Sequence, residues 1–98
     1  MNESTIEAYL RDEVKKIGGK AYKFVSPGNN GVPDRLVCLP GGKAVFVELK
    51  ATGKKPTKLQ ELQHKILRGM GFRVWVIDSE GMADNFIEFA TGKMMIDG

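Results

Sequence analysis

The chain has 98 residues, of which 42% are hydrophobic and 28% are charged. A chain of this length folds away only about 65% of its extended surface and fills one core, so we expect a single domain spanning residues 1–98. The composition excludes a disordered or collagen-like chain. Cys38 stands alone, which excludes an intrachain disulfide and a zinc-binding cysteine cluster and favours a reducing, cytoplasmic location.

The sequence predicts no membrane association. Its longest apolar runs, residues 44–47 and 74–77, are far shorter than the ~20 residues that cross a bilayer. The first residues carry Glu3 and no basic head, so we expect no signal or transit peptide.

Charge is distributed unevenly along the chain. The net charge of +3 includes +6 within residues 43–73 and −4 within residues 74–98. A basic block favours a polyanionic partner that is bound without regard to base sequence and with strong dependence on salt. A solvated lysine-rich surface has the same composition, so charge alone leaves both interpretations open.

The first predicted element is a helix from about Ser4 to the glycines at 18 and 19. Its apolar side chains recur every three or four residues and share one stripe: Ile6, Leu10, Val14 and Ile17. Strand-like runs follow at residues 20–25, 34–39 and 43–51, with a turn-rich segment, 26–31, after the first. Pro40-Gly41-Gly42 predicts a hairpin turn between the last two runs.

A second helical stripe follows the polar loop 52–56 and ends at Gly69 and Gly71; it consists of Leu59, Leu62, Ile66, Leu67 and Met70. The strand predicted at 72–77 is too apolar for an exposed face, so we expect it inside the sheet. A short third helix is expected over 82–90, and residues 93–98 form a tail of unassigned structure. This order predicts an α/β fold with a mixed sheet flanked by helices, in which an antiparallel hairpin precedes a right-handed crossover.

Two carboxylates and an amine are the candidates for chemistry. Asp34 opens one arm of the predicted hairpin, and Glu48 and Lys50 share one face of the other arm because residues two apart on a strand point the same way. Carboxylates suit Mg²⁺ or Mn²⁺, and Lys50 would neutralise charge on a phosphate. An isolated Glu–Lys pair is more often a solvent-facing ion pair, but the surrounding basic block favours phosphodiester hydrolysis.

Segments that cover most of the chain together resemble one family: residues 6–10, 23–28, 31–35, 47–50, 59–60 and 71–74. They are similar to the virus-type replication-repair nuclease (VRR-NUC) domain, a branch of the PD-(D/E)xK nucleases with the restriction-endonuclease-like fold. The resemblance implies that Asp34 and Glu48 bind the metal and that Lys50 is the catalytic lysine. It also implies that Gln60 belongs to the site and that Glu7 is a first-helix acid, which reaches the metal directly or through water.

Glu7 and Gln60 also have local explanations. Residues 4–7 and 57–60 both match capping boxes, in which the fourth residue bonds back to the backbone N–H of the cap. Spacing alone favours capping for both residues, whereas the resemblance favours a role in the site. Glu3, one helical turn before Glu7, is the alternative acid.

His64 invites a general-base role, because imidazole is the usual proton acceptor near neutral pH. We assign none, since a metal-activated hydroxide needs no histidine. The position of His64 between the apolar rows of the second helix predicts a partly exposed side chain. Cys38 and Trp75 have apolar neighbours and are expected in the core.

Six residues are the expected DNA contacts. Three lysines follow the catalytic strand and open the second helix, and three further residues lie within the resembling segments: Lys54, Lys55, Lys58, Lys23, Ser26 and Arg35. Loop lysines that only contact water have the same appearance in the sequence.

We therefore predict a cytoplasmic DNA endonuclease of bacterial or phage origin, dependent on Mg²⁺ or Mn²⁺, that uses no nucleotide cofactor and recognises charge and shape. The resemblance implies a homodimer that cuts branched DNA such as four-way (Holliday) junctions. Its dimer surface is predicted at Phe86, Ile87, Phe89, Met94 and Met95. The alternatives are a non-catalytic nucleic-acid-binding module with structural acids, and a nuclease subunit of a larger repair or replication assembly.

The hairpin loop decides whether the two carboxylates meet. A two-residue loop, Gly41-Gly42, would pair Asp34 with Leu49 and point Asp34 away from Glu48. A three-residue loop, Pro40-Gly41-Gly42, pairs Asp34 with Glu48. We predict the three-residue loop, or an irregularity between Asp34 and Leu39 with the same effect.

Overall fold

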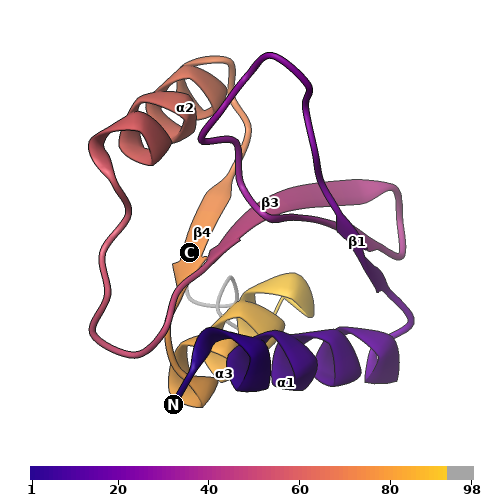
Figure 1. The fold of residues 1–98 in the computed structure, drawn as a ribbon. Helices are drawn as coiled ribbons and strands as arrows, with labels where there is room; N and C mark the ends of the chain where they lie inside the picture. The colour runs from indigo at the N-terminus through magenta and orange to yellow at the C-terminus, as the bar shows by residue number, and fades with distance from the viewer. Residues whose placement is uncertain (93–98) are drawn as a thin grey trace.

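The structure, a computed structural model, describes residues 1–92. Its elements are α1 (Glu3–Lys16), β1 (Lys20–Lys23), β2 (Arg35–Leu39), β3 (Lys43–Leu49), α2 (Lys58–Gly69), β4 (Val74–Ile77) and α3 (Glu80–Ala90). Helices α1 and α3 lie together on one side of the sheet, and α2 stands on the other side (Figure 1). The predicted α/β class and the mixed sheet between helices are confirmed, and the tail at residues 93–98 lies outside the described residues.

The four strands form one sheet in the order β1-β2-β3-β4. The first three strands are antiparallel neighbours, and β4 runs parallel to β3 after the crossover through α2. The prediction that the last strand lies inside the sheet is wrong, because β4 is an edge strand of the sheet that residues 1–92 form. Its apolar sequence reflects cover on both faces: Trp75 packs against Phe86 of α3, and α2 contacts β4 from the opposite side.

The hairpin between β2 and β3 has the predicted three-residue loop. Leu39 pairs with Lys43, and the two glycines of the loop have φ values of 86° and 79°, a conformation that side chains with a Cβ rarely adopt. At the other end of the hairpin Arg35 pairs with Val47. Asp34, one residue earlier, therefore lies opposite Glu48, as the candidate site requires.

The hydrophobic core fills the space between the sheet and the α1/α3 pair. Its buried residues include Ile6, Leu10 and Val14 of α1, Val37, Val45, Val47, Leu49 and Ile77 of the strands, and Ala83 and Phe86 of α3. The predicted dimer surface is wrong at Phe86, which is fully buried, and Ile87 and Phe89 pack against the same core. Met94 and Met95 lie outside the described residues.

The opposite face of the sheet is only partly covered. Phe24, Phe46 and Phe72 stack edge to face there, with ring centroids 5.3 and 5.7 Å apart. Four of the five apolar residues in the stripe predicted on α2 are about half exposed or more, and we call them the α2 row: Leu59, Leu62, Ile66 and Met70. The fifth, Leu67, is half-buried. The α2 row points away from the sheet, because α2 turns the face with His64 toward it.

Several local expectations are also corrected. The α1 helix begins at Glu3, and its cap is Asn2, whose side chain accepts the backbone N–H of Thr5, so the capping box predicted at residues 4–7 is wrong. Helix α3 begins at Glu80, two residues before its predicted start, and Ser79 is its cap. Cys38 is half-buried on the α2 side of the sheet, outside the main core. Among the described residues, no helix is long and apolar enough to cross a membrane.

Candidate active site

Asp34 and Glu48 come together at the open end of the β2–β3 hairpin. The Asp34 carboxylate accepts the backbone N–H of Leu49 at 2.8 Å, which ties it to the end of β3. The Glu48 side chain, near the end of that strand, is only 1% exposed. The register therefore presents two carboxyl groups on one face of the hairpin, although one of them is buried.

Two side chains of helix α2 contact the two carboxyl oxygens of Glu48. The Nε2 of His64 lies 3.2 Å from Oε1 of Glu48, and the side-chain amide of Gln60 donates to Oε2 at 3.4 Å. Gln60 also completes the predicted capping box with Thr57, since its Oε1 accepts the backbone N–H of Thr57 at 2.9 Å. The two roles weighed for Gln60 thus coexist, because its amide group has a separate donor and acceptor.

The pKa values of Glu48 and His64 are both shifted toward the neutral forms of these side chains. Burial raises the pKa of Glu48 to about 9, a hydrogen bond from the protonated Glu48 to Asp34 and the charge of Asp34 add to the shift, and the Lys50 ammonium opposes it. Burial and then the nearby Arg68 lower the pKa of His64. The metal-free protein therefore keeps both groups of the buried pair neutral near pH 7. A cation beside Glu48 would favour the ionised carboxylate instead.

Lys50 follows the last residue of β3 and is half-buried. Its backbone N–H donates to the carbonyl of Ile77 at 3.0 Å, which continues the pairing between β3 and β4. The ammonium is near enough to Glu48 to act on its pKa. Lys50 thus belongs to the same cluster as the two carboxyl groups.

Glu7 is bound to an arginine. Its carboxylate contacts Arg35 at 2.7 Å and Arg11 at 3.8 Å. The arginine predicted to contact DNA is largely buried in this ion pair, with a side chain 13% exposed. A pocket beside the pair is lined by Glu3, Glu7, Lys23, Phe24, Asp34 and Arg35. Both first-helix acids thus share a pocket with Asp34, while the buried Glu48 lies outside its lining.

The other predicted DNA contacts lie apart from one another. Lys54 and Lys55 are exposed in the loop between β3 and α2, and Lys58 is exposed at the start of α2. Ser26 lies in the loop after β1, where its hydroxyl accepts the side-chain amide of Asn29 at 2.9 Å. The lysines therefore offer positive charge near α2, whereas Ser26 is part of a turn.

The cluster fits a hard divalent cation. Within residues 1–92, no group of three or more His, Cys, Asp or Glu side chains is arranged to hold a metal ion. A magnesium site commonly uses one or two protein carboxylates, with water and substrate oxygens as its remaining ligands. Asp34 and Glu48 supply that number, and the raised pKa of Glu48 indicates an acid that lacks a positive neighbour strong enough to keep it ionised.

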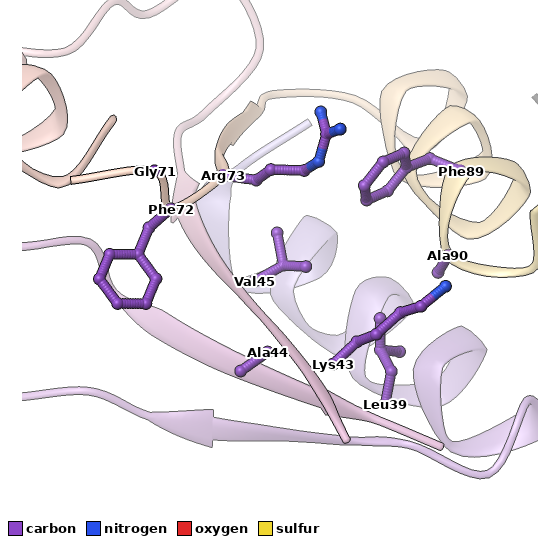
Figure 2. Close-up of a pocket in the computed structure, with 9 residues that line it drawn as sticks. All are labelled: Leu39, Lys43, Ala44, Val45, Gly71, Phe72, Arg73, Phe89 and Ala90. Atoms are coloured by element: carbon purple, nitrogen blue, oxygen red, sulfur yellow. The ribbon is translucent and has the colours of Figure 1, made fainter. Parts of the chain in front are cut away.

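An apolar pocket lies at the other end of β3 (Figure 2). It is lined by Leu39, Lys43, Ala44, Val45, Gly71, Phe72, Arg73, Phe89 and Ala90, with the Arg73 guanidinium 4.9 Å from the ring centroid of Phe89. No predicted site residue lines this pocket. The candidate chemistry is therefore confined to the region around Asp34 and Glu48.

Comparisons with known proteins assign the chain to a family. No protein-family model matches it. A protein named "Putative nuclease p44", from Acyrthosiphon pisum secondary endosymbiont phage 1, is 55% identical over 83 residues, which cover 85% of this chain and 89% of that protein. A solved structure of a VRR-NUC domain is 34% identical, with a TM-score of 0.83 and coverage of 88% of this chain and 94% of that one. The chain belongs to the VRR-NUC family of nucleases.

Membership of the VRR-NUC family confirms the resemblance noted in the sequence. It makes this chain a nuclease domain, whose substrate is nucleic acid.

The residue that sequence reasoning missed is His64. It was expected to be partly exposed, but its side chain is 1% exposed and contacts Glu48. A signal was present: Gln60 and His64 are four residues apart, so they share one helix face. An interpretation that placed Gln60 at the site could have placed His64 beside it.

Proposed function

We propose that this VRR-NUC domain is a DNA endonuclease that depends on Mg²⁺ or Mn²⁺ and selects branched substrates, such as four-way junctions, by their structure. The observation that carries the proposal is the meeting of Asp34 and Glu48 at the hairpin end, with Lys50 beside them. A module that only bound nucleic acid would gain nothing from two adjacent acids, since uncompensated carboxylates repel phosphate.

Asp34 and Glu48 are the residues that would hold the metal ion. When bound, a divalent cation lowers the pKa of water and polarises a phosphoryl oxygen. The Leu49 N–H orients the Asp34 carboxylate, and Gln60 orients that of Glu48. Lys50 is proposed to neutralise charge that develops on the phosphate, or to orient the attacking water.

We retain Glu7 as a supporting acid of the site. Its carboxylate lines the same pocket as Asp34, and its ion pair with Arg35 favours a contact through water over direct binding to the metal. Glu3 lines that pocket too and stays the alternative. The Arg35 side chain is then an internal partner of Glu7 as well as a candidate phosphate contact.

DNA binding is proposed to rest on charge. Lys54, Lys55 and Lys58 are exposed on one side of the cluster, and Lys23 lines the pocket beside Asp34 on another. Contacts of this kind bind phosphates and read no base sequence. They support selection of DNA by shape. Ser26, in the loop after β1, is retained as a further proposed contact.

The proposed active form is a homodimer, and the α2 row is the best-supported surface for the second copy. Exposed apolar residues on a monomer surface are usually scattered singly, whereas these four large side chains lie together along one face of a helix. The row lies on the helix that carries Gln60, so a two-fold axis there would set two active sites at a defined separation. Light scattering tests this: Leu62→Glu with Ile66→Glu should yield a monomer, and Lys15→Glu on α1 should not.

The deciding experiment is cleavage of a labelled four-way junction, a flap and a plain duplex, with Mn²⁺ or with EDTA. We expect cleavage only with the metal and a preference for the junction. Calorimetry should show Mn²⁺ binding that weakens in Asp34→Asn and in Glu48→Gln. Tight junction binding without cleavage under any metal condition would favour the binding module, and activity that required further proteins would favour a subunit of a larger assembly.

A further inference from the structure

One member of a buried polar pair, His64, has no role in the proposed chemistry. In the described part of the chain, Glu48 and His64 are the fully buried polar residues, each 1% exposed, and their side chains meet at 3.2 Å. Burying two ionisable groups is costly unless each satisfies the other. Such a pair inside a chain of 98 residues calls for a functional explanation.

The pair is also the place where α2 meets β3. His64 is the one buried residue of α2, and the α2 row points away from the sheet. Gln60, one turn earlier, contacts the other oxygen of Glu48 at a longer distance, 3.4 Å. The position of α2 and the orientation of the Glu48 carboxyl group are therefore coupled through these two contacts.

We propose that His64 is a positioning residue for metal binding, whose Nε2–H donates to Oε1 of Glu48 and holds the carboxylate toward Asp34. The inference rests on the proposed metal site at Asp34 and Glu48. A carboxylate bound on one oxygen by a buried imidazole loses most of its rotational freedom, so less entropy is lost when it binds a cation. His64 contacts Glu48 and not the metal ion in this proposal, so its effect on metal affinity acts through the orientation of the Glu48 carboxylate.

The geometry explains why a histidine serves here. Gln60 reaches Glu48 from the first turn of α2, where its own Oε1 is engaged by the cap at Thr57. His64 lies one turn further along, with the imidazole between Glu48 and an open groove lined by Lys58, Lys65 and Arg68. A planar ring fills this position and donates from its far nitrogen, which a shorter side chain cannot do.

The test is calorimetric binding of Mn²⁺ to the whole chain and four variants. His64→Leu removes the donor, His64→Asn keeps an amide that is too short to reach Glu48, and His64→Gln places an amide nitrogen at about the distance of Nε2. We expect Mn²⁺ affinity to fall about 10–100-fold in His64→Leu and His64→Asn, the range for loss of a partner behind a metal ligand. His64→Gln should recover most of it, and Gln63→Leu, the matched control on the same helix, should bind like the unchanged chain.

The Mn²⁺ affinities decide whether His64 positions Glu48 for metal binding. Unchanged affinity in His64→Leu and His64→Asn overturns the inference and leaves the proposed nuclease site intact. Affinity in His64→Gln as low as in His64→Asn also overturns it, because a donor at the right distance would then be irrelevant. If His64→Leu fails to fold, the contrast between His64→Asn and His64→Gln gives the answer. Absence of Mn²⁺ binding by the unchanged chain, together with metal-independent cleavage, would overturn the proposed function itself.

Discussion

The two faces of the sheet are built on different principles. The face toward α1 and α3 buries a continuous set of apolar side chains, among them Leu10, Val47 and Phe86, and contains no buried polar residue within the described part of the chain. The face toward α2 carries the buried pair Glu48–His64, and the apolar row of α2 lies outside it.

This difference indicates that one face mainly stabilises the fold and that the other carries the candidate active site. Burial of large apolar side chains supplies most of the folding free energy, so the α1/α3 face is expected to hold the fold. The α2 face gives up apolar contacts to accommodate two acids, an amide and an imidazole, as functional sites commonly do. Substitutions on the two faces should therefore affect different measurements.

The largest effect is expected for the amine on the α2 face. Lys50→Ala should lower single-turnover cleavage by about 10²–10⁴-fold, the range for removal of a positioned group that assists proton transfer. The melting temperature and junction binding should change little, because the side chain is only half-buried. Cleavage near the level of the unchanged chain would remove Lys50 from the mechanism.

A matched pair of leucines tests the comparison directly. Leu10→Ala, in α1, should destabilise the fold by about 2–5 kcal/mol, since it leaves a cavity beneath the sheet. Leu62→Ala makes the same chemical change in α2, where the side chain is 51% exposed, and should cost less than about 1 kcal/mol. Urea unfolding measures both, at a protein concentration low enough to keep the chain monomeric. Equal costs would show that α2 is packed as tightly as α1.

The buried acid should make the stability of the metal-free protein depend on pH. Because the pKa of Glu48 is raised to about 9, the fold prefers its protonated form, whereas the unfolded chain ionises it near 4.3. Its contribution to stability is complete below that lower value and is lost as pH rises toward 9. Burial also lowers the pKa of His64, which weakens the fold below about pH 6.5, so the comparison is made above that value. Urea unfolding at about pH 7 and about pH 9 should show the loss in the unchanged chain and a smaller one in Glu48→Gln. Identical pH profiles would mean that Glu48 ionises normally.

The smallest effect concerns the exposed lysines. Junction affinity should fall with salt at a slope near −0.9 per phosphate contacted. Replacing Lys54, Lys55 and Lys58 together by alanine should flatten that slope by roughly two to three, because each lysine neutralises about one phosphate. A filter-binding series between low and moderate salt measures it. An unchanged slope would indicate that DNA binds to another surface, such as that around Lys23.

Local patterns predicted the elements well. Apolar spacing located α1 and α2, and the glycines of the hairpin set a three-residue loop, which in turn put Asp34 opposite Glu48. These features depend on neighbours close in the chain, and the two-residue period of a strand leaves little freedom once the loop length is known. The meeting of the two candidate carboxyl groups was therefore predictable.

What the sequence by itself determined is the order of elements, the hairpin register and, through its motifs, the VRR-NUC family. The tertiary structure alone decided which face of α2 meets the sheet, that β4 lies at an edge, and that Glu7 is bound to Arg35. Helical periodicity shows which side chains share a face but not what that face contacts. His64 illustrates the limit: its burial depends on Glu48, a residue 16 positions away on another element, and only the packing of α2 on the sheet brings the two together.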